Sequence, residues 1–293
     1  MRLRDRSHSG RRADARRPHG SRASAPKGAV FVATDPASSP GPPSTLSPAE
    51  LVRAAWHAFP GFLTVFLVRT AFPNEHHRAW RAFSVARALA LPLAACWAVE
   101  LWRLRLRRTR RGVASAAARL ADAFFARALR DTERDRVHGT AWYLLGVCAS
   151  LCLYPCDVAA LSICVLAFCD PAASVAGRAF RDARLNRRFA NGKSVVGSLA
   201  CFAVAFATAH ALFRPDAGLF RDARGSATTT PEPRRRDVEA DAAVACFAAI
   251  VGLIAAGVEF LGSAAGGVND NAAIPVLVGA AAWPARGALL GWE

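Results

Sequence analysis

Residues 194–213 run for 20 residues without an Asp, Glu, Lys or Arg. A helix of about 20 apolar residues is long enough to cross the ~30 Å hydrocarbon core of a bilayer. Six further apolar segments occur, at 54–70, 82–102, 140–156, 157–169, 242–262 and 272–291. The sequence therefore predicts an all-α, polytopic membrane protein of about six to seven transmembrane helices. A large soluble helical core is the alternative, and the charge-free run counts against it.

The charge of the chain is separated from these apolar segments. The sequence has 38 Lys+Arg against 22 Asp+Glu, a net charge of +16, and is 53% hydrophobic. A basic soluble chain would indicate a nucleic-acid-binding protein, but here the basic residues gather in the N-terminal tail and in the loops. We therefore predict no nucleic-acid partner and read the charge as a sign of membrane topology.

Residues 1–48 are rich in Arg, Ser, Pro and Gly, a composition that cannot bury enough apolar surface to fold. We expect a disordered basic tail there. An organelle transit peptide is the alternative, because the segment is also poor in acidic residues. Residues 49–293 would then form one membrane-embedded domain.

The loops indicate which ends of the helices share a side of the membrane. Loops with excess Arg and Lys tend to stay in the cytosol. The tail, residues 103–111 and residues 178–193 are all basic, and each is separated from the next by two apolar segments. The loop at 214–241, with six Arg and six acidic residues, falls on the other side. The N-terminus is therefore predicted to be cytosolic.

Ionisable residues at a membrane edge are costly, so each is a candidate functional residue. On the predicted topology several of them meet at the cytosolic face, whereas chance placement would spread them over both faces. They are Arg53 and His57 at the start of the first segment, Asp170 after the fourth, Lys193 before the fifth, Glu259 at the end of the sixth and Asp270 before the seventh.

Asp170 stands among small residues and is followed by Pro171. A carboxylate in such a place can hold a divalent cation or accept a proton. The alternative is an N-cap, with Pro171 in the first turn of a new helix.

Lys193 is the only lysine outside the tail, where Lys27 is the other. The run Gly192-Lys193-Ser194 precedes an apolar helix, so backbone N–H groups and a compact ammonium could hold phosphate there. It is not a P-loop, because Arg187 occupies the position of the first glycine of that motif and no strand precedes it. A topological anchor is the alternative, which Arg would serve equally well.

Glu259, Asp270 and Asn271 carry oxygen atoms suited to a hard cation. For the Asn-Asp-Asn stretch at 269–271 the alternative is a turn that caps a helix. Arg53 and His57 lie four residues apart on one helical face, where they could grip a phosphate or a lipid headgroup. The alternative for this pair is an interfacial Arg and a packed His.

These residues fall into ordered blocks within residues 50–291. The blocks are Arg53…His57…Gly61, Asp170-Pro-Ala-Ala-Ser-Val-Ala-Gly177-Arg178, Gly192-Lys193-Ser194-Val-Val-Gly197-Ser198, and Glu259 with Asn269-Asp270-Asn271-Ala-Ala-Ile-Pro275. In this order they resemble the polyprenol kinase family, which includes dolichol kinases, phytol kinases and CTP-dependent diacylglycerol kinases. The last branch is the most similar. The sequence departs from the family pattern at Ala54, where a second basic residue is usual, and at Asn269, where Asp is usual.

The resemblance implies a lipid kinase that transfers a phosphoryl group from CTP to diacylglycerol and uses a divalent cation, Mg²⁺ or Ca²⁺. It implies that Asp170 binds the cation or activates the lipid hydroxyl, with Asp270 and Glu259 as further metal ligands. Arg53, His57 and Lys193 would also act in catalysis. The nucleotide would be held by Gly177, Arg178, Gly192, Lys193, Ser194, Gly197 and Asn271.

Other functions remain open at this stage. Within the family, the acceptor could be an isoprenoid alcohol, as in a phytol or dolichol kinase. Outside it, the alternatives are a lipid cytidylyltransferase and a non-enzymatic membrane protein. We expect the endoplasmic reticulum or nuclear envelope as the location, or the plastid envelope if the tail is a transit peptide.

Overall fold

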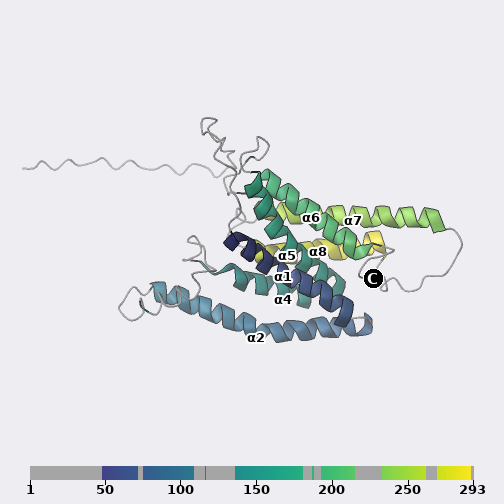
Figure 1. The fold of residues 1–293 in the computed structure, drawn as a ribbon. Coiled ribbons are helices and arrows are strands. Elements are labelled where there is room, and N and C mark those ends of the chain that lie inside the picture. The colour runs from purple at the N-terminus through teal and green to yellow at the C-terminus, as the bar shows by residue number, and fades with distance from the viewer. Residues whose placement is uncertain are drawn as a thin grey trace, which may run out of the picture. The chain divides into compact units, whose positions relative to one another are not determined.

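The computed structural model describes residues 48–71, 75–108, 116, 136–180, 187, 193–214, 233–261 and 269–291. Within them the chain forms helices and no strand, which confirms the all-α prediction (Figure 1). The helices are α1 (Pro48–Ala71), α2 (Glu75–Arg108), α4 (Gly139–Leu153), α5 (Cys156–Ala179), α6 (Val195–Phe213), α7 (Pro233–Leu261) and α8 (Asp270–Leu290). The predicted tail lies outside the described residues except for Pro48, which begins α1.

Each predicted apolar segment corresponds to one of these helices. Five spans in the described part are long and apolar enough to cross a membrane: Phe83–Leu106, Cys156–Ala179, Val195–Phe213, Val238–Leu261 and Asp270–Leu290. The third predicted segment is α4, which is apolar but only 15 residues long. The first is α1, with 24 residues. The chain is an integral, multi-pass membrane protein.

One helix boundary differs from the prediction. The fourth segment does not end before Asp170, because α5 continues without interruption to Ala179 with Pro171 inside it. The alternative in which Asp170 caps a new helix is therefore wrong. A proline within a helix removes one backbone hydrogen bond, but beyond it Ala173 and Gly177 are buried against neighbouring helices. This packing keeps the segment helical, so Asp170 projects from the body of α5.

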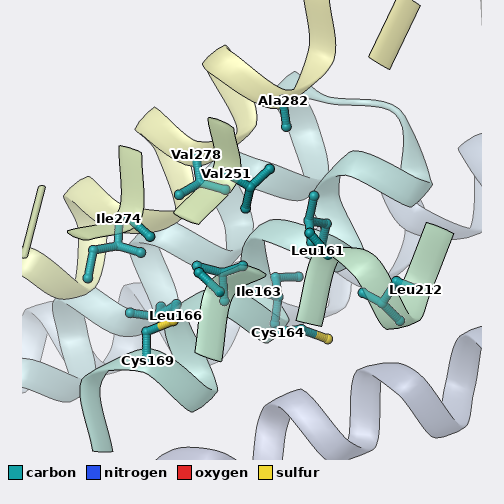
Figure 2. Close-up of a cluster of buried hydrophobic side chains, with 14 of the residues drawn as sticks. Leu161, Ile163, Cys164, Leu166, Cys169, Leu212, Val251, Ile274, Val278 and Ala282 are labelled. Atoms are coloured by element: carbon teal, nitrogen blue, oxygen red, sulfur yellow. The ribbon is translucent and has the colours of Figure 1, made fainter. Parts of the chain in front are cut away.

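Helix α5 forms the centre of the packing and contacts every other helix in the described part (Figure 1). A helix that is apolar on all sides belongs in a core, and residues 158–167 of α5 are all buried. Figure 2 shows Leu161 and Leu166 of α5 with Leu212 of α6, Val251 of α7 and Val278 of α8 in one cluster. By contrast, α2 lies at the edge, since only 11% of its apolar window is buried.

A buried ion pair fixes the relative direction of α5 and α8. Arg286 Nη1, near the end of α8, donates to Asp157 Oδ2, at the start of α5, over 2.7 Å. The start of α5 therefore lies against the end of α8. Asp170 is about 20 Å further along α5 at 1.5 Å per residue. It thus lies toward the end of the bundle where α8 begins, at Asp270.

Candidate functional site at one end of the bundle

Lys193 joins three helix ends. It precedes α6, and its Nζ donates to Glu259 Oε1 near the end of α7 and to Asp270 Oδ2 at the start of α8, both over 2.6 Å. The side chains are 22%, 6% and 18% exposed in that order. The only lysine outside the tail is thus held between two carboxylates that the sequence placed at the same membrane face.

The charge of Lys193 is secured by these partners. Burial on its own lowers the pKa of an ammonium. The nearby Glu259 and Asp270 carboxylates outweigh that effect, and the pKa of Lys193 lies above its ordinary value. The ammonium therefore stays protonated at neutral pH. Two carboxyl groups thus share one ammonium.

A second cluster is formed by α1, α4 and α5. His57 Nε2 lies 3.6 Å from Asp170 Oδ2, and the two side chains are 18% and 36% exposed. The rings of His57 and Tyr143 of α4 pack perpendicular to each other, at a centroid distance of 4.9 Å and an interplanar angle of 89°. The close approach of α1 to α5 beside His57 depends on Gly61, one turn later, because a Cβ there would lie 2.7 Å from Ala167 Cβ of α5. Tyr143 is a residue that the sequence analysis missed.

The two clusters are neighbours. Besides its bond to Lys193, Glu259 interacts electrostatically with both Asp170 and Asp270. The structure therefore brings together four predicted residues, Asp170, Lys193, Glu259 and Asp270, and places His57 beside the first of them. Arg53 lies one turn before His57 on α1 and is half-buried.

The guanidinium of Arg178 bonds to other groups of the protein. It donates to the backbone oxygen of Ser174 over 3.0 Å and to the Ser174 hydroxyl. It also pairs with the Glu50 carboxylate in the first turn of α1. The residue predicted to hold phosphate thus also ties α5 to α1. Glu50 is a further residue that the sequence analysis missed.

The glycines at 177 and 197 lie where α5 and α6 pack closely together. A Cβ at Gly177 would lie 2.8 Å from Ser194 Oγ, and one at Gly197 would lie 3.0 Å from the backbone oxygen of Ala173. Ser194 caps α6 by accepting from Gly197 N over 3.1 Å. Val195 N donates to Arg187 O. Of the residues proposed to hold phosphate, Gly197 therefore has its backbone N–H bonded within the chain, and Gly192 lies outside the described residues.

We expect Gly197→Ala to lower both the thermal stability and any activity of the protein. The added methyl group would press on the backbone of α5 and move the segment that carries Asp170. Overpacking of this kind typically costs about 1–3 kcal/mol. Gly257→Ala in α7 is the matched control, because a Cβ there has nothing within 4 Å. Melting curves of the detergent-solubilised variants test the difference, and equal curves for the two would contradict the packing argument.

The Asn-Asp-Asn stretch combines capping with a contact between helices. Asn269 caps α8 through its side chain, which accepts from Asn271 N over 3.0 Å. The turn interpretation of this residue is therefore correct. Asn271 Nδ2 donates to Gly139 O at the start of α4 over 3.1 Å. The amide predicted to contact the nucleotide thus joins α8 to α4, while Asp270 between them faces Lys193.

A buried ionic network on α2 fixes the start of α4. Arg103 Nη2 donates to Glu100 Oε2 over 2.8 Å and to Arg136 O over 2.6 Å. The same Glu100 oxygen accepts from His138 N over 3.1 Å. His138 in turn caps α4. It directly precedes Gly139, whose carbonyl oxygen accepts the hydrogen bond from Asn271 Nδ2. The sequence analysis treated Arg103 only as part of a basic loop.

The carboxylates of the site suit a cation that arrives bound to a nucleotide better than a metal ion held by the protein alone. Within the described ranges no group of three or more His, Cys, Asp and Glu side chains could hold a metal ion. Glu259 and Asp270 are turned to the Lys193 ammonium instead. Mg²⁺ bound to a nucleotide needs only one or two protein carboxylates, with phosphate and water as its other ligands. Asp170, at 36% exposure, offers one such carboxylate.

Three curated proteins are similar to parts of this chain, and each is named CTP-dependent diacylglycerol kinase 1. The one from Eremothecium gossypii is 40% identical over 76 residues, which are 26% of this chain and 23% of that protein. The one from Schizosaccharomyces pombe is 32% identical over 74 residues, 25% of this chain and 33% of that protein. The one from Saccharomyces cerevisiae is 28% identical over 152 residues, 51% of this chain and 49% of that protein.

The chain thus spans about a quarter to a half of the length of the curated relatives it matches. No protein-family model matches the chain. No solved structure matches it either. The fold and the similarities together describe an all-α integral membrane protein that is similar in part to lipid kinases.

Proposed function

We propose that this protein phosphorylates diacylglycerol with CTP and releases phosphatidate and CDP at the cytosolic face of the membrane. The observation that carries the proposal is the ionic site itself: Asp170 beside His57, next to Lys193 between two carboxylates, at one end of an apolar bundle. The names of the three similar proteins support the choice of donor and acceptor. The endoplasmic reticulum or nuclear envelope is the proposed location.

The reaction needs little covalent chemistry from the protein. The acceptor hydroxyl oxygen forms a bond to the γ-phosphorus of CTP, and the bond from that phosphorus to the β–γ bridging oxygen breaks, which leaves CDP. The hydroxyl proton passes to the Asp170 carboxylate. Catalysis of phosphoryl transfer depends mainly on positioning and on neutralising charge. A lipid reaches such a site laterally, whereas the nucleotide arrives from water.

The cationic residues supply the neutralisation. Lys193 stays protonated and lies at the N-terminus of α6, and Arg178 lies two turns beyond Asp170. Both are held by carboxylates in the structure, Lys193 by Glu259 and Asp270 and Arg178 by Glu50. In the proposed complex the triphosphate competes with these carboxylates for the cations. A divalent cation, Mg²⁺ or Ca²⁺, would arrive with CTP, and Asp170 would be its protein ligand.

The decisive experiment uses membranes containing the full-length protein, CTP labelled at the γ-phosphate, and dioctanoylglycerol. We expect label in phosphatidate and unlabelled CDP as the second product. A cytidylyltransferase would instead release the γ-label as pyrophosphate. Parallel reactions with phytol, dolichol and γ-labelled ATP compare acceptors and donors. Label in no lipid, or equal label in membranes without the protein, would refute the proposal.

A further inference from the structure

The two tyrosines of the chain differ in how their hydroxyl groups are satisfied. Tyr154 donates to Val276 O of α8 over 2.6 Å. Tyr143 is only 8% exposed, and its hydroxyl oxygen forms no hydrogen bond with any described residue. A buried tyrosine hydroxyl normally has a partner, because leaving it without one costs free energy. The Tyr143 hydroxyl therefore calls for an explanation.

The surroundings of Tyr143 link it to the proposed chemistry. Its ring packs perpendicular to the ring of His57. The phenol is also within electrostatic range of the Asp170 carboxylate. Tyr143 lies one turn into α4, about 6 Å beyond Gly139 along the helix axis. The carbonyl oxygen of Gly139 accepts a hydrogen bond from Asn271 Nδ2. The Tyr143 side chain is thus linked through His57 to the proposed proton acceptor and lies within the apolar part of the bundle.

Tyr143 lies where α1 meets α4, next to a helix with a strongly apolar outer face. Helix α1 packs mainly on α5, and α4 packs mainly on α8 and α2, so the contact between His57 and Tyr143 joins α1 to α4. The face of α1 that points away from α5 is strongly apolar: Val52, Trp56 and Phe59 are 69%, 74% and 55% exposed. Trp56 belongs to this face and directly precedes His57, so a lipid lying along it passes the helix turn that carries His57.

We propose that the Tyr143 hydroxyl binds the polar end of the acceptor lipid and holds its reacting hydroxyl beside Asp170. The ligand is a neutral lipid alcohol, the glycerol end of diacylglycerol on the proposed function, on which this inference rests. A phenol can donate to the alcohol oxygen and accept from it. Such a group suits an uncharged acceptor, whereas Lys193 and Arg178 suit phosphates. Tyr143 is therefore an acceptor-binding residue.

The test compares Tyr143→Phe with Tyr154→Phe. Phenylalanine keeps the ring against His57 and removes only the hydroxyl. We expect Tyr143→Phe to raise the KM for dioctanoylglycerol about tenfold, which corresponds to the loss of one hydrogen bond. The KM for CTP should stay unchanged, and the melting temperature should stay the same or rise, because a buried hydroxyl without a partner is removed. Tyr154→Phe loses a bond within the protein, so its melting temperature should fall while both KM values stay at wild type.

A binding measurement separates failure of this inference from failure of the proposed function. Protein labelled with 3-fluorotyrosine gives two ¹⁹F signals, because the chain has two tyrosines, and Tyr154→Phe assigns them. Dioctanoylglycerol without CTP should shift the Tyr143 signal. A shift in a protein that makes no phosphatidate would support the binding site and refute the kinase. An active wild type with an unshifted signal and an unchanged lipid KM in Tyr143→Phe would overturn the inference.

Discussion

Asp170→Asn is expected to reduce CTP-dependent labelling of diacylglycerol by about 10²–10⁴-fold, the range over which a positioned proton acceptor contributes. The amide has nearly the same shape as the carboxylate, but it neither accepts the hydroxyl proton nor carries the charge that attracts a nucleotide-bound cation. Asp170 is 36% exposed and its nearest ionic partner, His57, is 3.6 Å away. The fold should therefore tolerate the change. Initial rates and melting temperatures, measured on the same preparation, test both parts.

The matched control lies on the same helix. Asp157 is buried and pairs with Arg286 at the other end of the bundle. Asp157→Asn removes the partner of a buried charge, so it should lower the melting temperature while the folded fraction retains its rate. The two aspartates of α5 are thus expected to give opposite results. Wild-type activity in Asp170→Asn would remove this residue from the mechanism.

The overall fold was predictable because a bilayer requires long apolar helices with few charges. Each such helix can be recognised from its own stretch of sequence. The charge-free residues 194–213, for example, correspond to α6 with its cap. The continuation of α5 through Pro171 was not predictable. A proline favours a helix start when only neighbouring residues are considered. The outcome depends on the packing of the residues beyond it against α6, which lies in a distant part of the sequence.

The site was predictable in location but not in its contacts. Counting basic loops placed Lys193, Glu259 and Asp270 at one membrane face, and the structure brings them together. That Lys193 bonds to both carboxylates depends on the packing of α6, α7 and α8 over 66 and 77 residues of sequence. Tyr143 was missed for a different reason. A tyrosine in an apolar segment is ordinary, and what distinguishes it is that its hydroxyl has no hydrogen-bond partner among the described residues.

Lys193→Met is expected to destabilise the protein and abolish its activity. The change leaves Glu259, at 6% exposure, and Asp270, at 18%, beside each other without their shared cation. Removing one partner of a buried ion pair typically costs about 3–5 kcal/mol, because the remaining charge stays buried without compensation. A large fall in melting temperature should therefore accompany the loss of labelling, and the single variant cannot separate the two effects.

The triple variant Lys193→Met, Glu259→Gln, Asp270→Asn separates them. It removes all three charges together, so no uncompensated charge remains and most of the melting temperature should return. Activity should stay lost, because the ammonium that faces the phosphates is absent. Recovery of labelling along with stability would mean that the cluster only holds α6, α7 and α8 together.

Lys193→Arg refines the result, since it keeps the positive charge. The guanidinium is a planar fork rather than a compact point charge, whereas Lys193 Nζ lies 2.6 Å from both Glu259 and Asp270. We therefore expect reduced activity in a folded protein. Full activity would show that any positive charge serves at position 193. The proposed need for a compact ammonium there would then be wrong.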